Sequence, residues 1–180
     1  EEYRLRFEID INFCLSFLNS CIGHKKIAII LSQAVIDKID FINYDVWSRG
    51  YSFLFLALTY KNLGNLKQSK DLFFRAVDYA EKSEYIQVKA KALTGLAELY
   101  RIQSDFEKAI NYHQESIRIL SLIGAKCDLA EAYYQLALTY QAMNNPESQT
   151  HFNKALKLWT EIDAPKQCDR IRNSMNNPPN

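Results

Sequence analysis

Apolar residues recur three or four positions apart along most of the chain, which is the spacing of one face of an α-helix. Short polar or glycine-containing stretches interrupt this pattern and divide the chain into eight predicted helices and a shorter ninth. The predicted helices are 3–21, 24–39, 45–62, 66–82, 84–102, 106–122, 127–142, 147–162 and 165–174. We therefore expect an all-α protein, with residues 176–180 forming a frayed tail.

Residues at the predicted helix ends support these boundaries. Ser104 is expected to cap the helix that follows it, with Glu107 as its reciprocal partner in a capping box. Asn145 is expected to cap a later helix, in which Pro146 takes the first position. Three glycines lie where a helix end needs a left-handed residue: Gly23, Gly64 and Gly124.

A short motif recurs along the chain at a constant interval. It is Leu-Ala-x-x-Tyr, its equally spaced alanines are Ala57, Ala97 and Ala137, and a weaker copy with Leu15-Ser16 precedes the first at nearly the same distance. A second motif follows on the next helix of each unit, with the sequences Ser69…Phe73…Ala76, Ala109…His113…Ser116 and Ser148…Phe152…Ala155. Each unit is therefore predicted to be a pair of helices, in which the small alanine lets the second helix approach closely.

These motifs resemble the tetratricopeptide repeat, whose usual length is about 34 residues. The period here is longer, about 40 residues, and is similar to that of kinesin light chains, mitotic-spindle adaptors and bacterial Rap-type peptide-sensing regulators. The resemblance covers about residues 9–162 and implies a right-handed α-α superhelix of about four helix-turn-helix repeats plus a C-terminal capping helix. The expected repeats are 3–40, 43–83, 84–123 and 125–162, with the cap at 165–174, in one solenoid domain over residues 1–175.

Composition narrows the range of functions. The chain has 22 basic and 21 acidic residues, so it has no charge excess of the kind that binds nucleic acid or an anionic membrane surface. No apolar run reaches the length of about 18 residues that a spanning helix needs, so membrane insertion is not expected. The four cysteines have no metal-ligand spacing, and we interpret them as small buried thiols of a reducing, cytoplasmic protein.

The motifs of common enzyme classes are absent from the sequence. It contains no P-loop, GxGxxG, HExxH or GxSxG, so we expect no catalytic residues, no cofactor and no metal. His24 is interpreted as a turn residue, His113 as a partly buried packing residue and His151 as exposed. Trp47 and Trp159 are interpreted as packing residues, the second under the capping helix.

The resemblance also implies that the first helix of each repeat lines a concave groove, at repeat positions 2, 5, 9, 12 and 13. The expected lining residues are Phe13, Phe17, Tyr51, Leu54, Leu58, Lys61, Asn62, Lys91, Thr94, Glu98, Arg101, Glu131, Tyr134, Leu138 and Gln141. The Lys/Asn/Arg clamp of chaperone adaptors is absent from positions 5 and 9, which indicates that chaperone tails are not the ligand. An apolar groove with a mixed-charge flank favours a peptide or helical segment of a partner protein with an apolar face.

The leading hypothesis is therefore a non-catalytic interaction module that acts as a scaffold or adaptor. Two alternatives remain open from the sequence. One is a peptide-sensing regulatory domain of a signalling protein. The other is self-association through an exposed repeat face, giving a homo-oligomer.

Overall fold

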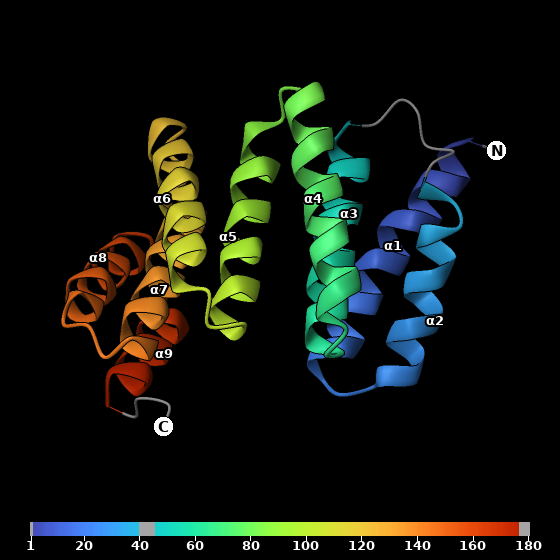
Figure 1. The fold of residues 1–180 in the computed structure, drawn as a ribbon. Coiled ribbons are helices and arrows are strands. Elements are labelled where there is room, and N and C mark those ends of the chain that lie inside the picture. Colours follow the sequence, from blue (N-terminus) through green and yellow to red (C-terminus); the bar gives the residue numbers. More distant parts are fainter. Residues whose placement is uncertain (1, 40–45, 177–180) are drawn as a thin grey trace. The chain divides into compact units, whose positions relative to one another are not determined.

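The computed structural model describes residues 2–39 and 46–176, and within these ranges it contains nine α-helices and no strand (Figure 1). The helices are α1 (Glu2–Cys21), α2 (Lys25–Ile36), α3 (Val46–Asn62), α4 (Leu66–Lys82), α5 (Ile86–Ile102), α6 (Phe106–Leu122), α7 (Lys126–Ala142), α8 (Glu147–Glu161) and α9 (Pro165–Asn176). Every predicted helix is present, with ends that differ by at most three residues, so the all-α prediction is confirmed. The predicted tail lies outside the described residues except for Asn176, which ends α9.

The chain divides into two compact units, residues 1–92 and residues 93–180, and α5 contributes to both. In the first unit, α1 packs against α2 and α3, and α3 packs against α4. In the second unit, α7 packs against α6 and α8, and α9 packs against α8. Each unit is thus a stack of antiparallel helix pairs joined by short turns.

The turns that end the helices share one backbone geometry. The three predicted glycines have φ values of 68° to 83°. Four other residues take the same left-handed conformation with φ of 53° to 60°, namely Glu84, Ser104, Asn144 and Asp163. After each such residue, the next amide donates to a carbonyl five residues earlier, as in the 2.9 Å bond from Asn65 to Tyr60. This is the Schellman pattern, which satisfies carbonyls left unpaired at a helix end.

The predicted cap at Ser104 is wrong. Ser104 is the left-handed turn residue, and Asp105 is the helix cap, whose side chain accepts a bond of 3.4 Å from the amide of Lys108. Turns of this kind place the left-handed residue one position before the cap, which is why the assignment shifts by one residue. The other predicted cap is also displaced by one residue, because Pro146 is the cap of α8 and the helix begins at Glu147. The side chain of Asn145 still accepts a 2.9 Å bond from the amide of Glu147.

The small residue of the repeated motif allows the close approach that its size predicts. Ala57, Ala97 and Ala137 are all fully buried. In the first unit, the hydroxyl of Ser69 on α4 donates to the carbonyl of Ala57 on α3 at 2.7 Å. A side chain longer than alanine at this position would separate the two helices and break this bond.

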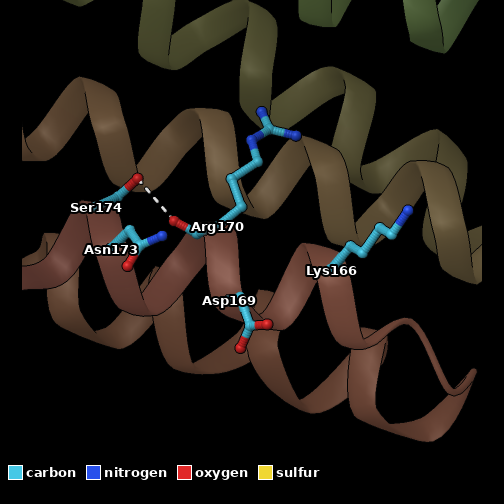
Figure 2. A pocket seen from close by; sticks show the side chains of 5 residues that line it. All are labelled: Lys166, Asp169, Arg170, Asn173 and Ser174. Carbon is cyan, nitrogen blue, oxygen red and sulfur yellow. Dashed lines mark hydrogen bonds between the residues drawn. The ribbon is translucent and has the colours of Figure 1, made fainter.

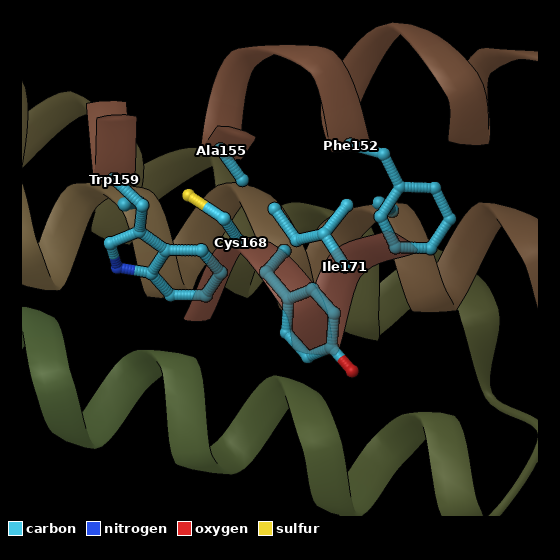
Figure 3. Packing of buried hydrophobic residues seen from close by; sticks show 8 residues of the cluster. Phe152, Ala155, Trp159, Cys168 and Ile171 are labelled. Atoms are coloured by element: carbon cyan, nitrogen blue, oxygen red, sulfur yellow. The ribbon is translucent and has the colours of Figure 1, made fainter. Parts of the chain in front are cut away.

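The core of the second unit is closed by α9 (Figure 3). Trp159 of α8 is 1% exposed and packs with Cys168 and Ile171 of α9, which confirms the prediction that it lies under the capping helix. Burying each large side chain of this kind contributes about 1.5–3 kcal/mol. The short final helix is therefore an integral part of this core.

His113 occupies the aromatic slot of α6, as predicted for a packing residue, but it is fully buried rather than partly buried. Its Nε2 lies 3.2 Å from the hydroxyl of Thr139, which itself donates to the carbonyl of Gln135. Because the threonine proton is already used, the hydroxyl accepts a bond from Nε2–H of the imidazole. Burial, and next the nearby Arg101 and His151, lower the pKa of His113 from 6.5 to about 3.

Three further expectations are wrong. His151 is not exposed, because its ring is stacked between Tyr133 and Tyr140, at centroid distances of 5.9 Å and 5.2 Å. Trp47 is not a buried packing residue, because it is 48% exposed. Cys168 alone among the cysteines is buried, while the other three are exposed and all four are free. A residue's side-chain type did not settle its exposure in these cases, because exposure depends on which helix faces and ends the other elements cover.

Candidate functional site

Five partly exposed aromatic rings adjoin one another on the surface of the first unit. They are Phe17 of α1, Trp47, Tyr51 and Phe55 of α3, and Tyr85, and we refer to them as the aromatic strip. Ring centroids are 5.3 Å apart for Phe17 and Phe55, 6.1 Å for Phe55 and Tyr51, and 4.8 Å for Tyr51 and Trp47. Tyr85 contacts Tyr51 edge-on at 6.0 Å. The rings therefore form a continuous aromatic surface.

Helical periodicity places the three α3 rings on one face. Trp47, Tyr51 and Phe55 are spaced by four residues, so their side chains lie one above the next along the helix. Beneath them, Phe13 of α1 is 1% exposed and stacks on Phe55 at 5.3 Å. The strip is thus held from below by the core, so little side-chain freedom remains to be lost when a partner binds.

The C-terminal end of this α3 face is polar. Leu58 lies on the same face of α3 as the aromatic strip and is half-buried. Asn62 is exposed and donates a 3.0 Å bond to the hydroxyl of Ser20 on α1. Lys61, and Lys91 of α5, are half-buried in the same unit. The first unit therefore combines an aromatic surface with polar and basic groups.

The predicted lining residues of the first unit fall into two sets. Phe13 and Leu54 are only 1% and 2% exposed, so they belong to the core in this structure. The solvent-accessible set is Phe17, Tyr51, Leu58, Lys61, Asn62 and Lys91. Sequence reasoning missed Phe55, Tyr85 and the role of Trp47. The spacing of four residues from Trp47 to Tyr51 to Phe55 was the signal that could have found two of them.

The predicted lining residues of the second unit form a chain of polar contacts. The guanidinium of Arg101 donates to the side-chain carbonyl of Gln135 at 3.0 Å, and the amide of Gln135 donates to Glu131 at 2.8 Å. Burial lowers the pKa of Arg101, and the nearby carboxylate of Glu98 opposes this effect. Because these groups are already paired with each other, the energy available for a new partner is smaller here than at the aromatic strip.

Helix α9 contacts three of the predicted lining residues of α7. Arg170 makes two bonds of 3.0 Å to Glu131 and lies 4.0 Å from the ring centre of Tyr134. The hydroxyl of Tyr134 bonds Ser174 at 2.9 Å, and Gln141 donates to the carbonyl of Ser174 at 3.0 Å. Burial disfavours the charge of Arg170, but the bonds to Glu131 outweigh it, so the pKa of Arg170 is raised. The last helix of the chain thus covers this part of α7.

The remaining predicted residues of the second unit differ in accessibility. Thr94 is 7% exposed and shares a 2.8 Å bond with Ser116, and Tyr134 is 5% exposed. The half-buried residues are Glu98, Arg101, Glu131, Leu138 and Gln141. Thr94 and Tyr134 therefore offer almost no surface to a partner, whereas the half-buried residues offer part of their mostly polar side chains.

An open pocket of about 560 Å³ lies along α9 and is lined by Lys166, Asp169, Arg170, Asn173 and Ser174 (Figure 2). All five residues come from one helix, and the hydroxyl of Ser174 is satisfied by the carbonyl of Arg170 at 3.1 Å. Small-molecule sites are concave and mostly apolar. This pocket is open and is lined by charged and polar residues of a single helix, so we do not assign it a small-molecule ligand.

Neither a metal cluster nor a membrane span occurs among the described residues. In that part of the chain, no group of three or more His, Cys, Asp or Glu residues is placed to hold a metal ion. Among the same residues, none of the helices has the length and apolar character needed to cross a bilayer.

Models of the tetratricopeptide repeat match residues 50–122 and residues 130–158. The matches include the three strong copies of the repeated motif. No curated protein matches the chain.

Several solved structures have the same fold. BtubC (BKLC) from P. vanneervenii superposes with a TM-score of 0.72 at 16% identity, over 100% of this chain and 86% of that one. Aspartyl phosphate phosphatase F from Bacillus subtilis gives a TM-score of 0.75 at 13% identity, over 88% of this chain and 42% of that one. TPR-like repeats of a protein described as a kinesin light chain from Podosopora anserina give 0.65 at 15% identity, over 98% and 95%. At these identities the likeness concerns the fold alone.

Proposed function

The chain belongs to the tetratricopeptide repeat family, whose fold typically mediates contacts between proteins, and we propose that it is a non-catalytic module that binds a peptide or helical segment of a partner protein. In this proposal it acts as a scaffold or adaptor. The principal contact surface is the aromatic strip of the first unit.

The continuity of the strip is the observation that carries the proposal. Tyrosine and tryptophan are the side chains most often found at binding hot spots, where they combine a large apolar area with few rotatable bonds. Trp47 is 48% exposed and its neighbours are held by ring contacts of 4.8 Å to 6.1 Å. A surface of this kind gains free energy when an apolar partner displaces the water that covers it.

The dimensions of the strip indicate the kind of partner. From Trp47 to Leu58, α3 rises about 16 Å, which is roughly three turns of a helix laid alongside it. An amphipathic helix with apolar residues at positions i, i+3 or i+4, and i+7 would place its apolar side chains along this length. The polar groups at Asn62 and Lys61 would then face the polar end of such a segment.

A reducing, intracellular compartment agrees with the cysteines. All four thiols are free, and three of them are exposed. Exposed unpaired thiols are uncommon in secreted proteins, where disulfides form readily. We therefore place the module in the cytoplasm.

The test uses a phage-displayed peptide library selected on the purified protein. The expected consensus has apolar residues at helical spacing, and its affinity is measured by isothermal titration calorimetry. Trp47→Ala combined with Tyr51→Ala should weaken the selected peptide at least about tenfold, because two hot-spot side chains are removed.

The matched control is Phe74→Ala. Phe74 of α4 is 40% exposed and does not belong to the strip, so its removal should leave the affinity unchanged. Circular dichroism establishes that all variants remain helical. Equal affinity of the wild type and the double variant would refute the proposed site.

A further inference from the structure

Helix α1 has apolar side chains on two opposite faces. One face packs into the first unit through the buried residues Ile9, Phe13, Ser16 and Ser20. The opposite face is exposed, and we call it the N-terminal apolar face. Its residues and their exposed fractions are Tyr3 (77%), Phe7 (66%), Ile11 (54%), Leu15 (42%), Leu18 (55%) and Ile22 (65%).

The charge on this face is confined to its N-terminal end, where exposed Arg4 lies on the same side of α1 as Phe7 and Ile11. Residues 11–22 include no Lys, Arg, Asp or Glu, and neither do residues 27–36, which make up most of α2. Ile27 and Ile30 of α2 are 48% and 68% exposed. Single exposed apolar residues are ordinary, but a row of five on α1, continued by Ile22 in the turn that follows, marks an interaction surface.

The equivalent face of α3 packs against the first helix of the preceding repeat, α1. Ser48, Ser52 and Thr59 occupy on α3 the repeat positions that Phe7, Ile11 and Leu18 occupy on α1, and all three are fully buried. Ser48 bonds Asp10 of α1 at 2.7 Å, and Thr59 lies 3.3 Å from Ser16 of α1. On α3 this face therefore receives a neighbouring helix.

The side chains on α1 are too large for that same packing. Ile11 takes the repeat position that Ser52, Ala92 and Ala132 hold in the other three repeats, where each of these residues is buried. Small residues let two helices approach closely, whereas the bulky row on α1 requires a wider helix separation. A helix that binds this face must therefore pack differently from a repeat neighbour.

We propose that the N-terminal apolar face pairs with the same face of a second copy, giving a two-fold symmetric dimer in which the α1 helices lie antiparallel. A stable interface needs about 800 Å² from each partner. If a large side chain has roughly 150–200 Å² of surface, the six residues offer on the order of 650 Å². This is about four fifths of the requirement.

The row is also suited to pairing with itself. In an antiparallel arrangement centred between Ile11 and Cys14, Phe7 lies across from Leu18 and Tyr3 from Ile22. Each aromatic ring then faces an aliphatic side chain, which fills the space between the helices evenly. The two Cys14 residues would be separated by about 5 Å along the helix axis, because each residue rises about 1.5 Å.

This interface is distinct from the proposed partner site. Phe17 belongs to the aromatic strip and points roughly 100° away from Leu18 around α1. Dimerisation and peptide binding can therefore fail or succeed independently. If the wild type bound the peptide but did not dimerise, the result would count against the dimer and not against the proposed partner site.

Light scattering after size exclusion tests the dimer. The wild type is expected at twice the 20.9 kDa of one chain, with dissociation on dilution. Phe7→Glu combined with Ile11→Glu should give a helical monomer, because two buried carboxylates would face apolar groups. Leu122→Glu is the matched control, since Leu122 is 74% exposed on α6, and it should remain dimeric.

A cross-link reports the orientation of the helices. A short bis-maleimide, which spans a wider gap than a disulfide, should cross-link two chains in the wild type and in Cys127→Ser, but not in Cys14→Ser. A wild type that stays monomeric up to millimolar concentration would overturn the inference. So would a dimer that survives the double glutamate substitution, because its interface must then lie elsewhere.

Discussion

One position of the repeat holds different side chains in successive units. Phe73, His113 and Phe152 occupy the same slot on the second helix of three repeats, and all are buried. Phenylalanine fills the slot with an apolar ring. In the third repeat, the imidazole of His113 fills the slot instead, at the cost of desolvating its nitrogens. Within the described residues, its Nδ1 has no hydrogen-bond partner.

The buried imidazole makes stability depend on pH. The pKa of His113 is about 3 in the folded chain and near 6.5 in the unfolded chain, so only the unfolded state takes up a proton between these values. The free energy of unfolding should therefore fall as pH decreases below 6.5, by up to about 1.4 kcal/mol per pH unit from this group. Urea unfolding at a series of pH values measures this slope.

The slope can be assigned with His113→Phe, which copies the residue of the neighbouring repeats. This variant should lose the part of the slope that His113 contributes, while its stability at pH 8 stays close to that of the wild type. Half-buried His151, whose pKa burial also lowers, adds a smaller slope of the same sign in both proteins. Parallel curves for the two proteins would show that His113 is not the responsible group.

Residue identity alone predicted the buried slots well and the exposed site poorly. The alanines of the motif and Trp159 were placed correctly, and His113 was correctly placed as a packing residue, although it is fully rather than partly buried. Leu54 was expected on the surface and Phe55 was not considered, yet Leu54 is 2% exposed and Phe55 is half-buried. Adjacent residues on a helix differ by about 100° in direction, and only the packing of α1 and α4 around α3 decides which of the two faces solvent.

At the scale of helices, the turns set the register of the whole chain. Left-handed residues stand at positions 64, 84, 104, 124 and 144, so the interval between successive turns is constant over this part of the chain, while Gly23 and Asp163 depart from it. Two of these five are glycines, which the sequence signals directly. At Glu84, Ser104 and Asn144 the same conformation is imposed by the flanking helices, so sequence rules that look for glycine miss it.

Two substitutions in these turns should change the free energy of unfolding in opposite directions. Ser104→Gly should stabilise the protein by about 1 kcal/mol, because glycine adopts a left-handed φ without a steric penalty. Gly64→Ala should cost a similar amount, since a new Cβ would have open space but the φ of +82° would remain strained. Chemical denaturation measures both changes.

The control is Gln114→Gly, an exposed position in the middle of α6. Glycine should destabilise the helix there by about 1 kcal/mol. If Ser104→Gly also destabilised the protein, the turn would not be limited by backbone strain.

Arg170 links α9 to α7. Arg170→Ala should lower the free energy of unfolding by about 1 kcal/mol, because it removes a partly exposed two-bond ion pair and a contact with the Tyr134 ring. Arg170→Lys should recover only part of this loss, since lysine cannot make both bonds to one carboxylate. Thermal unfolding of the three proteins measures the order. Equal stability of the lysine variant and the wild type would contradict the bidentate account.

At the scale of the molecule, the constant period of the repeat predicted the helix number, the helix ends and the family. It could not predict where the chain is open to a partner. Tyr134 shows why, because its repeat position implies a groove residue while α9 leaves it only 5% exposed. The aromatic strip depends likewise on contacts between α1, α3 and Tyr85 that no single repeat contains.

The central claim, that a partner segment binds at the aromatic strip, can be observed directly by fluorine NMR. The chain has two tryptophans, so labelling with 5-fluorotryptophan gives one signal from exposed Trp47 and one from buried Trp159. Titration with the library-selected peptide should shift the Trp47 signal and leave the Trp159 signal in place. A peptide that binds while the Trp47 signal stays unchanged would contradict the account.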